Sequence, residues 1–228
     1  MTDEPTSAFL AASPWATALS PEQLRRVRNE ATTSRFAAGA TVCVRNSPAQ
    51  HWLGVAEGML KLETIASDGR TTTFAGVPSG AWFGEGAVLK GEPRPYSVIA
   101  IRDSVVVFVP RQVFLELLEG SQAFSRWLID QLNARLAHYV ALVENFRLND
   151  STARVAYCLS ELFNPQLYPN TSPKLAISQS DIARLSGLSR QITNRSLQEL
   201  QESGLIRVGY GRVEVLDLAR LQRAAQTG

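Results

Sequence analysis

Residues 177–195 of the chain read ISQSDIARLSGLSRQITNR. This order of residues predicts two helices joined by a tight turn. Ser178 and Asp181 have the spacing of a capping box, which starts a helix. Gly187 suits the left-handed backbone of the turn, and Ser189 is an N-cap candidate for the second helix. The segment therefore predicts a helix-turn-helix.

The second helix is expected to run to about residue 203, with a polar outer face and an apolar inner face. The side chains expected to face the protein are Ile192, Leu197 and Leu200. The outer face would carry Arg190, Gln191, Asn194, Arg195 and Gln198. Arginine forks and side-chain amides are the groups that pair with base edges in the major groove of DNA. We therefore predict double-stranded DNA as a partner.

The sequence after this helix predicts a small β-hairpin, or wing. Gly204 would end the helix, and the residues 205–208 and 212–215 are β-prone runs on either side of a Gly-Tyr-Gly turn. An ordinary amphipathic helical hairpin with a polar, solvated face is the alternative. The two caps, the turn glycine and the wing together favour a winged helix.

Composition sets broader limits on the protein class. The 228 residues are enough for two domains, and the net charge of +2 does not suit a polybasic nucleic-acid coat. After residue 150 there are 9 Lys and Arg against 6 Asp and Glu (+3), whereas the first 150 residues have 14 against 15 (−1). The modest positive excess lies with the expected DNA-binding part.

The cysteines and the start of the chain favour a cytoplasmic protein. Cys43 and Cys158 are far apart and no CxxC occurs, which fits a reducing compartment better than a disulfide scaffold. The first residues lack the basic and apolar regions of a signal peptide, and no apolar stretch is long enough to span a membrane.

The pattern between residues 36 and 109 is that of short strands separated by turns. A helical lead-in is expected up to about Phe36, and Asp68-Gly69 is expected to form a hairpin turn. The predicted strands are 41–44, 52–55, 59–64, 71–74, 96–100 and 104–109. Short strands at regular spacing predict a small β-sandwich or barrel.

From about Pro110 the chain is expected to be helical. Apolar residues then alternate in steps of three and four, the spacing of a coiled-coil seam. The predicted seam consists of Ile129, Leu132, Leu136, Tyr139, Val143 and Phe146. A helix buried against its own domain would give the same stripe, but a helix-turn-helix protein usually pairs to bind two half-sites. We expect a homodimer, with a hinge at 149–151.

This order of elements resembles the CRP/FNR superfamily of bacterial transcription regulators. The resemblance covers nearly the whole chain and rests on Gly39, on the segments 55–62, 68–70, 80–85 and 148–156, and on the helix-turn-helix. It implies an α+β fold with an antiparallel, jelly-roll-like β-roll (1–122), a dimerisation helix (123–149) and a winged helix-turn-helix (150–228). It also implies a homodimer that binds a partly palindromic promoter site and acts on RNA polymerase.

The resemblance sharpens the expected DNA contacts. Arg190, Gln191 and Arg195 match the three positions with which family members contact bases. The cyclic AMP receptor has a glutamate at the position of Gln191, and a carboxamide favours adenine instead. We expect base contacts from Arg190, Gln191, Asn194 and Arg195. The expected phosphate contacts are Ser178, Ser180, Thr193 and Arg212.

The effector pocket expected from the resemblance departs from that of cyclic AMP receptors. A Gly-Glu pair and an Arg-Ser-Ala sequence hold the ribose and phosphate there, whereas this chain has Gly84-Glu85 and Arg94-Pro95-Tyr96. Proline lacks a backbone donor and tyrosine is bulky. Tyr139 stands where those receptors contact adenine. Gly84, Glu85, Arg94, Tyr96 and Tyr139 are thus the candidate pocket residues; the effector stays unknown, and the sequence argues against cyclic AMP. A salt bridge or loop cap is the alternative role for Glu85 and Arg94.

Other effectors and functions fit the residues less well. Two distant cysteines argue against an iron–sulfur cluster, and His51 and His138, expected at the surface or in packing, argue against haem. Cys158 is expected to pack, and Trp52, Trp82 and Phe83 are expected in the core. The same two histidines leave a cupin-type metal enzyme without its ligands, so we expect no enzyme and no metal. A ligand-binding module whose helical domain contacts proteins remains the alternative function.

Overall fold

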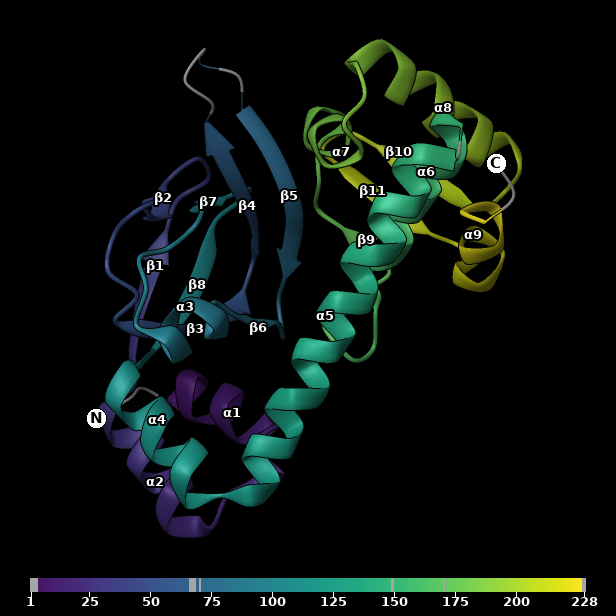
Figure 1. Ribbon diagram of the computed structural model, residues 1–228. Helices are drawn as coiled ribbons and strands as arrows, with labels where there is room; N and C mark the ends of the chain where they lie inside the picture. The colour runs from purple at the N-terminus through teal and green to yellow at the C-terminus, as the bar shows by residue number, and fades with distance from the viewer. Residues whose placement is uncertain (1–3, 66–68, 70, 149, 170, 227–228) are drawn as a thin grey trace.

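The protein has a β-roll, a long helix and a small C-terminal domain, in that order along the chain (Figure 1). The computed structural model describes residues 4–65, 69, 71–148, 150–169 and 171–226. The α+β fold class predicted from the sequence is confirmed. Asp68 and Asn149, placed by the sequence in a hairpin turn and in the hinge, lie outside the described residues.

The β-roll is built from two four-stranded antiparallel sheets with the orders β1-β8-β3-β6 and β2-β7-β4-β5. The strands of the first sheet are β1 (Thr32–Phe36), β8 (Ser104–Pro110), β3 (His51–Glu57) and β6 (Trp82–Phe83). Those of the second sheet are β2 (Thr41–Cys43), β7 (Ser97–Ala100), β4 (Met59–Ile65) and β5 (Thr71–Pro78). All six predicted strands are present. Apolar side chains of both sheets, such as Leu53, Leu60, Val98 and Val106, fill the space between them.

Helices close one end of the roll (Figure 1). They are α1 (Glu4–Ala12), a 3₁₀ turn (Ala16–Ala18), α2 (Pro21–Glu30) and α4 (Arg111–Gly120). The core at this end contains a group of aromatic rings. Trp52 lies with its ring centroid 4.3 Å from that of Trp82 and 5.4 Å from that of Trp15. Trp52, Trp82 and Phe83 are core residues, as predicted. The helical lead-in was wrong in one part, because residues 32–36 pair with β8 as strand β1.

Helix α5 (Gln122–Leu148) runs from the base of the roll to the C-terminal domain (Figure 1). Its first half packs on the aromatic group through Phe124 and Leu128. Its second half contributes Ala141 and Leu142 to the core of the C-terminal domain. The helix therefore contacts both parts of the molecule.

The C-terminal domain consists of four helices and a three-stranded sheet, counted over the described residues. These elements are α6 (Ser151–Glu161), β9 (Lys174–Leu175), α7 (Gln179–Ser186), α8 (Arg190–Glu202), β10 (Ile206–Gly209), β11 (Arg212–Val215) and α9 (Leu218–Ala224). The predicted helix-turn-helix and wing are thus confirmed. Figure 1 shows α8 on the side of this domain away from the roll.

The described part of the chain contains no helix that is both long enough and apolar enough to cross a membrane. It also contains no group of three or more His, Cys, Asp or Glu side chains placed to hold a metal ion.

Candidate nucleic-acid interface and effector pocket

The two helices of the helix-turn-helix begin and end as the sequence predicts. The Ser178 hydroxyl accepts from the Asp181 N–H at 3.1 Å, and the Ser189 hydroxyl accepts from the Ile192 N–H at 3.3 Å. Gly187 has φ = 62°, in the left-handed region that favours glycine. These caps fix where α8 starts, and so fix its outward face.

The four predicted base contacts lie on one side of α8. Arg190, Gln191 and Arg195 are exposed, and Asn194 is half-buried. Arg195 donates to the Glu199 carboxylate at 3.0 Å. A base contacted by Arg195 would therefore compete with Glu199 for the guanidinium. The Thr152 hydroxyl also lies 2.5 Å from the Glu199 carboxylate. Hydrogen bonds from Thr152 and Arg195 lower the pKa of Glu199.

Two predictions for α8 were wrong. Thr193, expected to contact phosphate, is fully buried, and its hydroxyl donates to the Ser189 carbonyl at 3.0 Å. It therefore holds the first turn of the helix together. Ile192, expected to face the protein, is 43% exposed. The other predicted phosphate contacts are placed at or near the surface: Arg212 is exposed on the wing, and Ser178 and Ser180 are half-buried at the start of α7.

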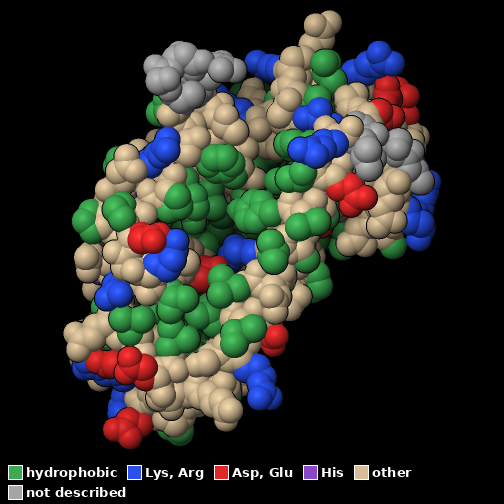
Figure 2. All heavy atoms as spheres, viewed as in Figure 1, with side chains coloured by type: hydrophobic (Ala, Val, Ile, Leu, Met, Phe, Trp, Pro, Cys, Tyr) green, Lys and Arg blue, Asp and Glu red, His purple; other side chains and the backbone are tan. Residues whose placement is uncertain are grey.

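A second candidate site is a pocket of about 310 Å³ between the roll and α5. Figure 2 shows a hollow on this face, bordered by hydrophobic side chains with acidic and basic groups inside it. The predicted residues Gly84, Glu85, Tyr96 and Tyr139 line the pocket. The lining residues that the sequence did not predict are Leu62, Gly86, Ala87, Lys90, Glu92, Pro93, Pro95, Leu132 and Arg135.

A buried ion pair lies at the centre of this pocket. Arg135 donates to the Glu85 carboxylate at 2.7 Å and to the Trp82 carbonyl at 2.5 Å. Burial opposes the charge on Arg135, but the attraction and hydrogen bond of Glu85 outweigh it and raise the pKa of the guanidinium. The second carboxylate oxygen of Glu85 is buried and has no hydrogen-bond partner among the described residues. The wall of the pocket thus contains one unused acceptor, which is shielded from the pocket space in this conformation.

Arg94 is not where the sequence analysis put it. It is 3% exposed and does not line the pocket; its guanidinium donates to the His51 carbonyl at 2.7 Å and lies against Gly84. The neighbouring Pro95 offers no N–H. Lys90, at the pocket rim, is already paired with Glu92. No lining cation among the described residues is therefore without a carboxylate partner.

Burial also affects the tyrosines and cysteines. It raises the pKa of Tyr168 to about 12, and that of the Cys158 thiol to about 12. Burial raises the pKa of Cys43 as well. Both thiols are therefore held in the less reactive protonated form. Cys158 packs against the C-terminal core, as predicted.

The exposed apolar stripe on α5 differs from the predicted seam, because three of the predicted residues contact the pocket or the C-terminal domain instead. Leu132 and Tyr139 line the pocket, and Phe146 stacks on Arg154. The large apolar side chains of α5 that stay exposed are Ile129 (56%), Leu136 (64%), Val140 (60%) and Val143 (52%). They form one stripe along the helix. His138 does not join it: it is half-buried and lies 2.6 Å from the Glu161 carboxylate.

Two protein families match successive parts of the chain. The family described as "Cyclic nucleotide-binding domain" matches residues 33–121, and that described as "Crp-like helix-turn-helix domain" matches residues 153–224. They correspond to the β-roll and to the C-terminal domain, with α5 between them.

Full-length relatives have the same arrangement. "Transcriptional regulator LdrP" of Thermus thermophilus is 31% identical over 194 residues, 84% of this chain and 95% of the relative. "Cyclic AMP receptor protein" of the same organism is 27% identical over 213 residues, 93% of this chain and 97% of the relative. Among solved structures, a CRP/FNR family transcriptional regulator of T. thermophilus is 27% identical, with a TM-score of 0.63 over 86% of this chain and 99% of that one. FixK2 of Bradyrhizobium japonicum shares the fold, with a TM-score of 0.71 over 85% and 96% of the two chains at 23% identity.

Proposed function

Because the chain belongs to the CRP/FNR family of transcription regulators, we propose that it binds a specific, partly palindromic promoter site as a homodimer. The outward face of α8 carries this proposal, since Arg190, Gln191 and Arg195 are exposed side by side on a capped helix. Asn194 flanks them. Arg212 on the wing, with Ser178 and Ser180, would contact phosphates and orient the helix in the groove.

Dimerisation is supported by the stripe of Ile129, Leu136, Val140 and Val143. Four large apolar side chains on one exposed helix face are unfavourable in water, and a second copy of the same helix would cover them. A two-fold dimer places two copies of α8 on two half-sites. We keep the division at residues 122 and 149, with α5 as the dimerisation helix.

The roll is proposed to sense a small molecule other than cyclic AMP. A cyclic phosphate needs free cationic or N–H donors, whereas Arg135 and Lys90 are each paired with a carboxylate, and Arg94 is buried behind Gly84 and is not among the pocket-lining residues. The unused Glu85 oxygen is buried in the pocket wall, and it would accept a hydroxyl or amine of an effector whose binding moves the side chains that cover it. The role is proposed to be regulatory, with RNA polymerase as the protein partner and the cytoplasm as the location, because the relatives are transcription regulators.

Selection of binding sites from random duplex DNA tests the function. We expect a two-fold symmetric site with guanines opposite Arg190 and Arg195 and an adenine opposite Gln191. Affinity should fall steeply as salt rises, because phosphate contacts release counterions. Arg190→Ala should weaken binding by about 1–3 kcal/mol and relax one base position, and cyclic AMP should change the affinity by less than about twofold.

A Gln191→Glu variant is the matched control. It introduces the carboxylate that the cyclic AMP receptor has at this position, which accepts a hydrogen bond from the amino group of cytosine, so the base preferred at one position of the site should change. Recovery of the same base with both side chains would contradict the Gln191 assignment. Enrichment of no sequence at all would reject DNA-directed regulation and favour a ligand-binding module whose C-terminal domain contacts proteins.

A further inference from the structure

Arg154, in the first turn of α6, lies where α5, α6 and the helix-turn-helix meet. Its guanidinium donates to the Ser186 carbonyl, at the end of α7, at 2.7 Å. The same group lies over the Phe146 ring of α5, 4.5 Å from the ring centroid. One side chain therefore joins the long helix to the turn that precedes α8.

The turn is shaped to receive this side chain. A Cβ atom at Gly187 would lie 3.2 Å from the Arg154 guanidinium and 3.7 Å from the Phe146 ring. Gly187 thus suits the turn through its positive φ, and its lack of a side chain leaves room for the close approach of Arg154. Ser189, two residues later, caps α8. A shift of Arg154 or Phe146 would move the turn, and with it the start of α8.

The contact uses the planar shape of the guanidinium as well as its charge. Among the described residues, Arg154 has no carboxylate within ion-pair distance, and its Nε is buried without a hydrogen-bond partner. A planar fork can donate in its plane to a carbonyl while its flat face stacks on a ring, whereas a lysine ammonium is a compact charge with no face to stack.

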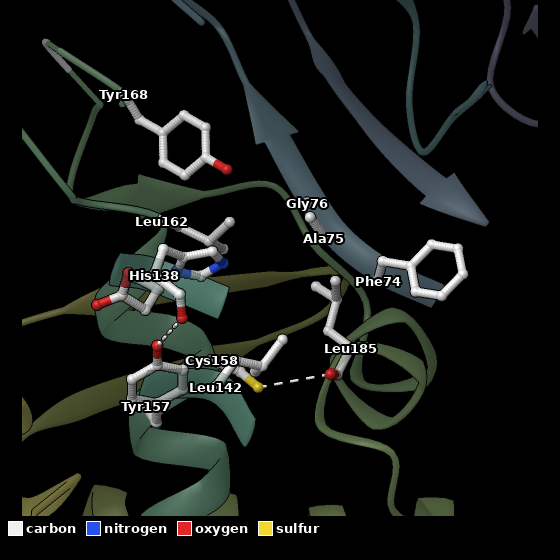
Figure 3. Close-up of a pocket in the computed structure, with 11 residues that line it drawn as sticks. Phe74, Ala75, Gly76, His138, Leu142, Tyr157, Cys158, Leu162, Tyr168 and Leu185 are labelled. Carbon is white, nitrogen blue, oxygen red and sulfur yellow. Dashed lines mark hydrogen bonds and ion pairs between the residues drawn. The ribbon is translucent and has the colours of Figure 1, made fainter. Parts of the chain in front are cut away.

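Other contacts hold α5 firmly to the rest of the domain. The Tyr157 hydroxyl donates to the His138 carbonyl at 3.1 Å (Figure 3), and Asn145 donates to the Ala225 carbonyl at 3.1 Å. These contacts tie α5 to α6 and to the end of α9. The Arg154 side chain links α5 to the helix-turn-helix, because it contacts Phe146 of α5 and the carbonyl at the end of α7.

We propose that Arg154 is a positioning residue: clamped between Phe146 and the Ser186 carbonyl, it sets the direction of α8 relative to α5 and so the half-site spacing that a dimer accepts. This inference rests on the proposed DNA-binding dimer. In such a dimer the two paired α5 helices set the positions of the two subunits. A small rotation of each α8 would then increase or decrease the distance between the two recognition helices. A single half-site would not sense that rotation, whereas a complete site would.

The test compares Arg154→Lys and Phe146→Leu with the unaltered protein on two kinds of DNA. One duplex carries a single selected half-site, and a series of duplexes carries both half-sites with the spacer lengthened or shortened by one or two base pairs. For both variants we expect half-site affinity within about twofold of the unaltered protein. Affinity for the best-spaced full site should fall about tenfold, the size of an ordinary coupling effect, and the preference among spacers should flatten.

Two controls separate positioning from other roles. Arg184→Lys changes an exposed arginine on α7 in the same way and should leave the spacer preference unchanged. The double variant Arg154→Lys/Phe146→Leu should lose no more full-site affinity than the weaker-binding single variant. The reason is that both substitutions break the same contact between the two side chains. Thermal unfolding of each variant checks the fold; if Arg154→Lys does not fold cooperatively, Phe146→Leu alone decides the question.

Three results would overturn the inference. An equal loss of affinity for half-sites and full sites, together with a salt dependence that corresponds to about one fewer released counterion, would mean that Arg154 contacts a phosphate. Additive losses in the double variant would mean two unrelated roles, and an unchanged spacer preference would mean no positioning role. If the unaltered protein itself selected no DNA sequence, the proposed function would fail first, so the two failures are distinguishable.

Discussion

Glu85 and Arg135 hold opposite charges in a largely buried ion pair: their side chains are 5% and 17% exposed. Removing one charge leaves the other buried and uncompensated. We expect Glu85→Gln to lower the free energy of unfolding by about 3 kcal/mol, the lower end for such pairs, because Arg135 keeps some solvent contact and its bond to Trp82. Urea unfolding would measure the change.

The paired replacement Glu85→Met/Arg135→Met is the matched control for this site. It removes both charges while keeping apolar volume, so it should recover much of the stability lost in Glu85→Gln. Equal stability of Glu85→Gln and the unaltered protein would contradict the expectation and would mean that water reaches the pair.

Helical periodicity predicted the direction of the polar residues on α8, but it failed for Ile192, which is 43% exposed. The outward placement of Arg190, Gln191 and Arg195 follows from the caps at Ser178 and Ser189. Thr193 was misjudged because a short side chain on the buried side of a helix can satisfy its hydroxyl on the preceding turn. Arg135 was missed, although it lies one helical turn before Tyr139 and spacing alone puts both on one face.

At the scale of elements, the exposed stripe of α5 predicts self-association. Leu136→Lys would place a charge in the middle of the interface, where it has no partner. We expect the dissociation constant of the dimer to rise about 100-fold or more, and full-site DNA binding to fall with it. Light scattering after gel filtration would measure the oligomeric state.

Ala137→Lys is the matched control, because Ala137 is exposed next to the stripe and is not part of it. It should leave the dimer intact. A Leu136→Lys protein that remained dimeric at micromolar concentration would place the interface elsewhere on the molecule.

Elements were predictable where the sequence marks them locally. Glycine turns and β-branched runs marked six strands of the roll. Strand β1 was marked less clearly: its sequence TTSRF has two β-branched threonines but directly follows a helix without a glycine turn, and its pairing partner β8 lies about 70 residues away in the chain. Such a strand depends on a non-local partner, which the local pattern cannot reveal.

At the scale of the whole molecule, β5 packs directly on the C-terminal domain. Figure 3 shows Ala75 and Gly76 of β5 facing Leu162 and Leu185. A Cβ atom at Gly76 would lie 2.9 Å from the Met59 methyl and 3.0 Å from a Leu162 methyl. We expect Gly76→Val to overpack this contact, to lower the free energy of unfolding by about 2 kcal/mol and to speed hydrogen exchange in α7.

Gly86→Ala is the matched control, because a Cβ atom at Gly86 has open space around it. It should leave exchange in α7 unchanged and stability unchanged or slightly higher. Unaltered exchange in Gly76→Val would show that the roll and the C-terminal domain do not depend on this contact.

Helix α5 has three occupied faces, and this limits how the protein can evolve. The pocket side carries Arg135 and Tyr139, the exposed stripe carries Leu136 and Val140, and the side facing the C-terminal domain carries His138 and Leu142. A substitution on the pocket side of α5 that changed which ligand binds would lie next to residues of the exposed stripe and of the contact with the C-terminal domain. Most such substitutions would therefore also affect dimerisation or the position of the C-terminal domain. Divergence toward a new signal should therefore accumulate in α3 (Glu85–Lys90) and the loop 92–96, which border the same pocket.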